Sequence, residues 1–151
     1  MDAKRPIGSL HDLSQLAARA SSLRPRVLVA EDQPAMLALI ARLLRDQGYE
    51  VVEISDGAIL WDELRTCQLG AEDAREPDLI VSDVRMPGRS GLEVLALVRK
   101  SDWATPVILI TAFGDRETHD HAYRLGAAQV FNKPFDLRHL IATARQLVPP
   151  T

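Results

Sequence analysis

The sequence predicts an α/β protein with a doubly wound, five-stranded parallel sheet and helices on both faces. Short apolar, β-branched segments alternate five times with segments whose apolar residues recur at helical spacing. The short segments are apolar on both faces, as strands buried between two helical layers are. Right-handed crossovers then favour the doubly wound arrangement.

The first unit shows this pattern most clearly. Its strand is "RVLVA", residues 26–30, and its helix is expected over 34–48. Pro34 suits the first helical turn and Gly48 the end of the helix. The helix has one apolar face, made by Leu37, Ile40, Leu43 and Leu44.

Four further strand and helix pairs follow in order, each a short apolar run and then a segment of helical periodicity. The expected pairs are 50–54 with 57–69, 78–82 with 92–100, 106–110 with 116–126, and 129–131 with 136–148. The polar stretch 70–77 separates the second helix from the third strand and is expected to be a surface loop.

Composition narrows the class of protein. The 151 residues are 46% hydrophobic and 26% charged, which suits one domain with a real core. The net charge of −3 and the scattered basic residues argue against direct nucleic-acid contact. Cys67 is the only cysteine, so an internal disulfide framework is excluded and a reducing, cytoplasmic location is expected. No apolar run approaches the roughly 20 residues of a membrane span, and no secretion signal is expected.

Three regions are expected along the chain. Residues 1–25 form an N-terminal extension, a short helix with Ser9 as a possible cap and then a linker. Its apolar stripe can pack on the domain, pair with a second copy or belong to a longer chain. The domain itself is expected over 26–148, followed by a C-terminal tail at 149–151.

Polar residues follow four of the expected strands. Ligands of open α/β sheets bind beyond the carboxyl ends of the strands, near the point where strand order reverses. The polar residues at these positions are Glu31 and Asp32 after the first strand, Asp83 after the third, Thr111 after the fourth, and Lys133 with Pro134 after the fifth. Taken singly, Asp32 can be a helix cap, Thr111 a helix cap or simply the end of its strand, and Lys133 a solvated lysine.

Together these residues predict a site for a cation and a phosphoryl group. Three carboxylates at close range repel one another unless a cation is present. All-oxygen ligation with an incomplete protein cage suits Mg²⁺, and a lysine with a hydroxyl group can hold a phosphoryl group beside it. Asp83 is the best-placed covalent carrier, because an apolar strand leads to it and a Pro87-Gly88 turn follows.

At these residues the segment from Arg26 to Val148 resembles the receiver (REC, CheY-like) domain of bacterial two-component response regulators. The resemblance lies in Glu31-Asp32, "SDVRMPGRSG" around Asp83, "TA" at Thr111, and "FNKPF" around Lys133. It implies a flavodoxin-like sheet of strand order 2-1-3-4-5.

The resemblance also implies a role for each site residue. Asp83 would accept a phosphoryl group from a sensor histidine kinase or a histidine phosphotransfer protein. Thr111 and Lys133 would contact that group, and the Lys133-Pro134 peptide bond would be cis. The implied Mg²⁺ ligands are Asp32, Asp83 and the backbone carbonyl of Arg85, with Glu31 acting through a bound water.

The resemblance further implies a switch that catalyses only its own phosphorylation and dephosphorylation. Phosphorylation would draw Thr111 inward and reshape the surface of helix 116–126, strand 129–131 and helix 136–148, which an unknown effector reads. This surface is also a possible homodimer contact, although a polar helix 116–126 is equally an ordinary solvated one. The family's switch aromatic is replaced by Val130, and Phe131 should point to the opposite sheet face. We expect backbone and loop movement to carry the signal instead.

Other functions remain open on the sequence alone. The chain can be a single-domain messenger, a phosphorelay intermediate or a piece of a larger regulator. A degenerate receiver that acts by binding alone is the main alternative, favoured by Val130. A phosphatase that forms an aspartyl phosphate is disfavoured, because Arg85 stands where such enzymes carry a second Asp.

Overall fold

The computed structural model describes residues 24–70, 75–112 and 115–151, and the helix expected in the N-terminal extension lies outside them. The described elements begin and end within two residues of the expected positions. They are β1 (Arg26–Ala30), α2 (Pro34–Asp46), β2 (Glu50–Ile54), α3 (Gly57–Gln68), β3 (Leu79–Asp83), α4 (Gly91–Lys100), β4 (Val107–Thr111), α5 (Arg116–Arg124), β5 (Gln129–Asn132) and α6 (Leu137–Leu147).

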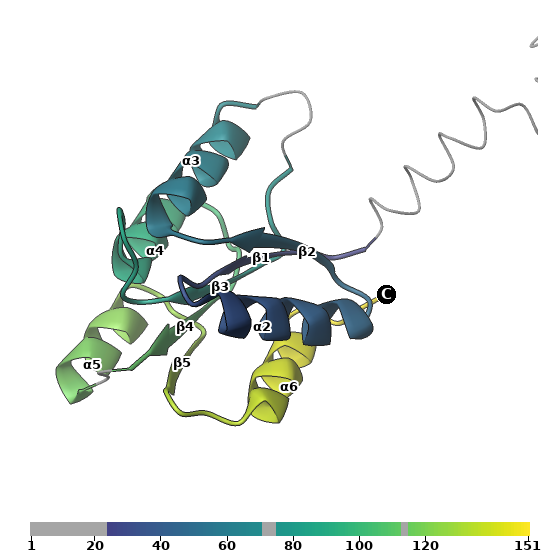
Figure 1. Ribbon diagram of the computed structural model, residues 1–151. Coiled ribbons are helices and arrows are strands. Elements are labelled where there is room, and N and C mark those ends of the chain that lie inside the picture. The colour runs from purple at the N-terminus through teal and green to yellow at the C-terminus, as the bar shows by residue number, and fades with distance from the viewer. Residues whose placement is uncertain (1–23, 71–74, 113–114) are drawn as a thin grey trace, which may run out of the picture.

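The strands form one parallel sheet in the order β2-β1-β3-β4-β5, so the predicted doubly wound fold is confirmed (Figure 1). Strand order reverses between β1 and β3, where Ala30 pairs with Ser82. On the other side of β3, Asp83 pairs with Ile110 of β4. The carboxyl ends of β1, β3 and β4 therefore lie next to one another at the switch point.

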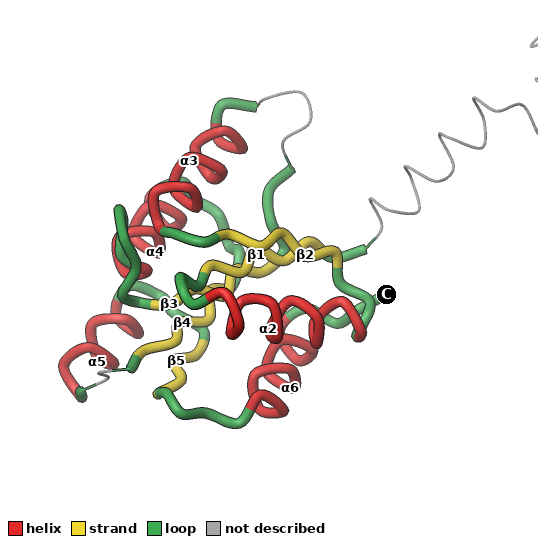
Figure 2. Tube along the Cα trace, viewed as in Figure 1, coloured by secondary structure: helices red, strands yellow, loops and turns green. Residues whose placement is uncertain are grey.

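Helices cover both faces of the sheet, with α2 and α6 on one side and α3, α4 and α5 on the other (Figure 2). Every residue of β3 and β4 is buried, which explains why these strands are apolar on both faces. Ile80 packs with the α3 and α4 layer, and its neighbour Val81 packs with the α2 and α6 layer. The two layers make two separate hydrophobic cores.

Four helices begin with a side-chain cap that accepts a hydrogen bond from the first turn. The caps are Asp56 of α3, Ser90 of α4, Asp115 of α5 and Asp136 of α6. The exception is α2, which starts at Gln33 without a side-chain cap and has proline in its first turn. Neither Asp32 nor Thr111 is therefore a helix cap, while Thr111 is the last residue of β4.

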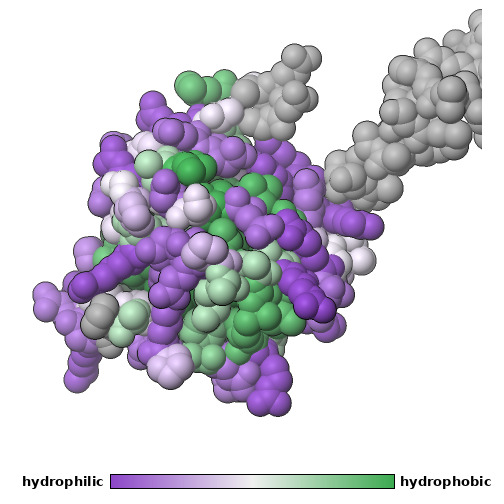
Figure 3. Space-filling view, viewed as in Figure 1, coloured by the Kyte–Doolittle hydropathy of each residue, from purple (hydrophilic) through white to green (hydrophobic). Residues whose placement is uncertain are grey.

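On the face drawn in Figure 3 the described surface is mostly polar, but hydrophobic residues gather beside α2 and α6. Leu43, Leu137 and Ile141 line a groove of about 340 Å³ between these two helices. In the ranges that the structure describes, no helix combines the length and the apolar character needed to cross a membrane.

Candidate metal-binding site at the switch point

The four strand ends bring the predicted polar residues into one place. Glu31 directly follows β1, Asp83 ends β3 and Thr111 ends β4, and these three residues are almost fully buried, with 1%, 5% and 2% of each residue exposed. Asp32, the next residue after Glu31, is exposed. Three buried polar residues at the ends of apolar strands make a polar cluster, here called the pocket, and the exposed Asp32 borders it.

Lys133 joins two of the carboxylates. Its Nζ lies 3.0 Å from Oδ2 of Asp83 and 3.2 Å from each carboxylate oxygen of Glu31. These ion pairs are largely shielded from water, since the Lys133 side chain is 18% exposed and that of Asp83 is 7% exposed. The ammonium group therefore forms ion pairs with both acids at once.

The close packing of these groups shifts the pKa values of Glu31 and Lys133. Burial, together with the neighbouring Asp83 carboxylate, raises the pKa of Glu31 to about 7, although Lys133 opposes this change. Burial alone disfavours the Lys133 ammonium, but Asp83 and Glu31 outweigh it, and the pKa of Lys133 is raised. The pocket therefore favours the charged form of Lys133 and disfavours the ionised form of Glu31.

The three carboxylates fit a divalent cation. Glu31, Asp32 and Asp83 each offer one oxygen, and these oxygens lie within 4.8 Å of one another. Two oxygens bound to the same Mg²⁺ lie at most about 4.2 Å apart, since each bond is about 2.1 Å long. A small contraction, or one ligand acting through water, therefore makes the cluster compatible with Mg²⁺.

Hydrogen bonds hold the backbone that follows Asp83 in place. The N–H of Val84 donates to Ile110 O at 2.7 Å, and its carbonyl accepts from Gly91 N at 2.8 Å. The loop then packs on the start of α3, where Gly57 N donates to Pro87 O at 3.0 Å. These contacts position the backbone that leads to Arg85, whose carbonyl is the expected metal ligand.

Lys133 is held from the opposite side of the site. Its backbone N–H donates to Thr111 O at 2.8 Å, and the Lys133-Pro134 peptide bond is cis, as expected. Lys133, the residue after β5, therefore lies directly beside the end of β4.

The switch region agrees with the strand alternation expected from the sequence. Val130 is buried with the α3 and α4 layer, while Phe131 packs with the α2 and α6 layer and contacts Phe135 at a ring distance of 5.8 Å. Sequence reasoning missed two features of this region. One is the pairing of Lys133 with Glu31, and the other is the hydrogen bond from Val130 N to the hydroxyl of Tyr123 at 3.1 Å.

The strand order is that of the CheY-like, flavodoxin-type fold, and the acidic cluster lies at its switch point. Comparison with known sequences then identifies the family. The chain belongs to the response regulator receiver family, because the model of the response regulator receiver domain matches residues 27–145. Receiver domains are signalling domains of two-component systems.

Two relatives come from Mycobacterium tuberculosis. The transcriptional regulatory protein TcrA is 37% identical over 122 residues, which are 81% of this chain and 45% of TcrA. The transcriptional regulatory protein PdtaR is 34% identical over 117 residues, 77% of this chain and 53% of PdtaR. The chain thus spans about half the length of these curated relatives.

Solved receiver structures share the fold. The receiver domain of the Francisella response regulator 1452 has a TM-score of 0.68 and 27% identity, covering 82% of this chain and 95% of that one. Chemotaxis protein CheY4 of Vibrio cholerae has a TM-score of 0.66 and 29% identity, covering 82% of this chain and 98% of that one.

Proposed function

We propose that this protein is a phosphorylation-dependent switch of a two-component or phosphorelay system and that Asp83 is its phosphoacceptor. The observation that carries the proposal is the position of Asp83, which is buried at the switch point with Lys133 Nζ 3.0 Å from Oδ2. The proposed receiver domain spans residues 26–148, preceded by an extension at 1–25 and followed by a tail at 149–151. The proposed location is the cytoplasm.

In the proposed reaction, a carboxylate oxygen of Asp83 attacks the phosphorus of a phosphohistidine. An O–P bond to Asp83 forms, the N–P bond of the donor breaks, and the imidazole nitrogen keeps the bonding electron pair. In this proposal Lys133 pairs with the transferred group, and the hydroxyl of Thr111 donates a hydrogen bond to it. The donor is a sensor histidine kinase or a histidine phosphotransfer protein.

Asp32, Asp83 and the Arg85 carbonyl would hold Mg²⁺, with Glu31 acting through water. When bound, Mg²⁺ supplies positive charge that stabilises the phosphoryl oxygens in the transition state. The fit rests on the three carboxylate oxygens that lie within 4.8 Å of one another. The exposure of Asp32 leaves the pocket accessible to the cation and the donor.

We propose that the surface formed by α5, β5 and α6 carries the signal to an effector protein. It adjoins Thr111 and Lys133, the two residues that would contact the phosphoryl group, through the pairing of β4 with β5. The proposed switch catalyses only its own phosphorylation and dephosphorylation, without direct contact with nucleic acid. The same surface is a possible homodimer contact.

Intact mass measurement tests this function. The protein is incubated with Mg²⁺ and acetyl phosphate beside two variants, Asp83→Asn and Asp62→Asn, the second being an exposed carboxylate on α3. We expect one added phosphoryl group in the wild type and in Asp62→Asn, and none in Asp83→Asn. An equal gain in all three proteins would show that Asp83 is not the acceptor.

The replacement of the family's switch aromatic by Val130 favours a second candidate, a degenerate receiver that acts by binding alone. In that case the wild type would gain no mass although it is folded and binds Mg²⁺. The same mass measurement therefore separates the two functions.

A further inference from the structure

Helix α5 is held to the domain by little apolar burial. Within its nine described residues only Ala122 is buried, whereas α2 and α4 each bury four residues. A helix with so few buried apolar contacts belongs to the part of a structure that moves most easily. Specific polar contacts must therefore contribute a large share of its attachment.

Two side chains of α5 supply such contacts to β5. The hydroxyl of Tyr123 accepts a hydrogen bond from Val130 N at 3.1 Å. Nε2 of His119 lies 2.8 Å from Oδ1 of Asn132, and because an amide oxygen only accepts, the imidazole is the donor. We call these two contacts, Tyr123 with Val130 and His119 with Asn132, the α5 latch.

The two side chains of the latch lie next to each other on α5. His119 and Tyr123 are four residues apart and so lie on one face of α5, with their ring centroids 6.5 Å apart. β5 is an edge strand, and an edge strand presents unpaired N–H and C=O groups. Tyr123 occupies the donor at Val130, the position at which the family's switch aromatic is missing.

The latch is connected to the site through the strand it holds. Asn132 pairs with Thr111 in the β4–β5 register, and the next residue, Lys133, donates its N–H to Thr111 O at 2.8 Å. These contacts link Thr111 and Lys133 through Asn132 to His119. The hydrogen bond between Lys133 N and Thr111 O, the peptide link to Asn132 and the contact of Asn132 with His119 therefore connect the pocket to α5.

We infer that His119 and Tyr123 are positioning residues that couple the phosphorylation site to α5, so that phosphorylation strains the latch and frees the helix. The inference rests on the proposed function, because it requires a phosphoryl group on Asp83. In the family, the residue that couples the site to this surface is an aromatic side chain on β5. We infer that Tyr123, a side chain of α5, has this coupling role here.

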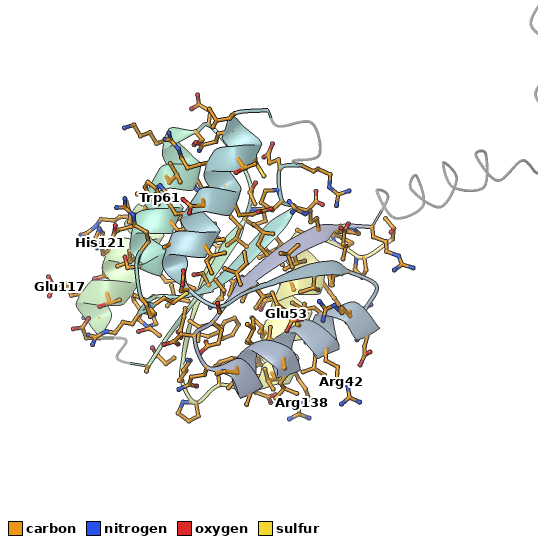
Figure 4. The ribbon with its side chains drawn as sticks, turned by 45° about the horizontal axis from the view of Figure 1, so that its top comes forward. Arg42, Glu53, Trp61, Glu117, His121 and Arg138 are labelled. Atoms are coloured by element: carbon orange, nitrogen blue, oxygen red, sulfur yellow. The ribbon has the colours of Figure 1, made fainter. Side chains whose placement is uncertain are left out.

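Hydrogen exchange of the full-length chain, with the intact mass measured on the same samples, tests the inference. The latch variant is His119→Ala with Tyr123→Phe. The matched control is His121→Ala with Tyr49→Phe. His121 points outward from α5 in Figure 4, and Tyr49 donates its hydroxyl hydrogen bond to Val148 O, away from α5.

In the wild type we expect acetyl phosphate to add one phosphoryl group and to speed exchange in α5. The latch variant should gain the same mass, but its α5 should exchange on the order of tenfold faster before phosphorylation and change little afterwards. The control should behave as the wild type in α5, and its exchange should rise only near α6 and α2.

The experiment distinguishes failure of the latch inference from failure of the proposed function. Equal mass gain with a wild-type exchange response in the latch variant would overturn the latch alone. Absence of mass gain in the wild type would overturn the proposed function, and the coupling role of the latch with it.

Discussion

Lys133 and Asp83 form the central ion pair of the site, with Nζ 3.0 Å from Oδ2, and the same ammonium group reaches both oxygens of Glu31. One lysine therefore separates two buried carboxylates that would otherwise repel each other. Since the pair is mostly shielded from water, its loss leaves buried charge without compensation.

Replacing Lys133 by Met should therefore lower the free energy of unfolding without Mg²⁺ by roughly 2 kcal/mol. The measurement is urea unfolding in EDTA. Lys100→Met, an exposed change on α4, should cost less than about 0.5 kcal/mol. If both variants lost the same stability, the ion pairs of Lys133 would contribute nothing specific.

Mg²⁺ should stabilise the wild-type fold through the acidic cluster. At a concentration of about ten times its Kd, a ligand that binds only the folded state adds about 1.4 kcal/mol. Asp32 is exposed, so Asp32→Asn should leave the stability in EDTA almost unchanged but remove most of the gain from Mg²⁺. Thermal unfolding with and without Mg²⁺ checks this. A full Mg²⁺ gain in Asp32→Asn would place the cation elsewhere.

Gly57 allows the loop after Asp83 to pack on α3. A Cβ at this position would lie 1.7 Å from Arg89 O, so the backbone would have to move. Gly57→Ala should cost about 3 kcal/mol or more and disturb Mg²⁺ binding, since the loop carries the Arg85 carbonyl. Urea unfolding and Mg²⁺ titration measure both effects.

The matched control for this change is Gly70→Ala. Gly70 has a φ of +69° but open space around it, so this change should cost about 1 kcal/mol of backbone strain and leave Mg²⁺ binding intact. Similar effects in both variants would show that the contact with Arg89 does not matter.

Arg99 connects α4 to two loops by hydrogen bonds to three carbonyls. Nη1 donates to Trp103 O at 3.0 Å and Thr105 O at 2.8 Å, and Nη2 donates to Gly126 O at 2.8 Å. Arg99→Ala should cost about 2 to 3 kcal/mol in urea unfolding. Arg99→Lys should recover less than half of the loss, because an ammonium group lacks the planar donor geometry.

Arg42→Ala, an exposed change on α2, is the control for Arg99 and should be nearly neutral (Figure 4). Full recovery by Arg99→Lys would mean that positive charge alone matters at this position.

Asp136 makes the start of α6 sensitive to acid. Its hydrogen bonds from the Arg138 side chain and from Arg138 N lower the pKa of the carboxyl group from 3.8 to about 2. Because the pKa is lower in the folded state, this stabilisation is present above about pH 4 and is lost as the pH falls towards 2.

An NMR titration of the Asp136 carboxyl group measures this value directly. Arg138→Gln should raise the pKa towards 3.8, whereas Arg145→Gln, farther along α6, should not change it. A pKa that stayed near 2 in Arg138→Gln would assign the shift to the backbone hydrogen bond alone.

The sequence predicted the helices and strands well, because they depend on local patterns, and it placed the candidate site residues at the ends of those strands. Apolar runs in β3 and β4 indicate strands buried on both faces, and the position of Asp83 after such a run indicates the edge of the sheet. The resemblance to receiver domains then implied the strand order and the roles of the polar residues.

The sequence by itself thus determined which polar residues stand at strand ends, since the end of an apolar run is visible in the order of residues. Only the tertiary structure decided how they pair, because Glu31 and Lys133 are 102 residues apart and meet only when β1 and β5 are in one sheet. The same holds for the α5 latch. Helix periodicity places His119 and Tyr123 on one face, but the contact with β5 depends on how α5 packs against the sheet edge.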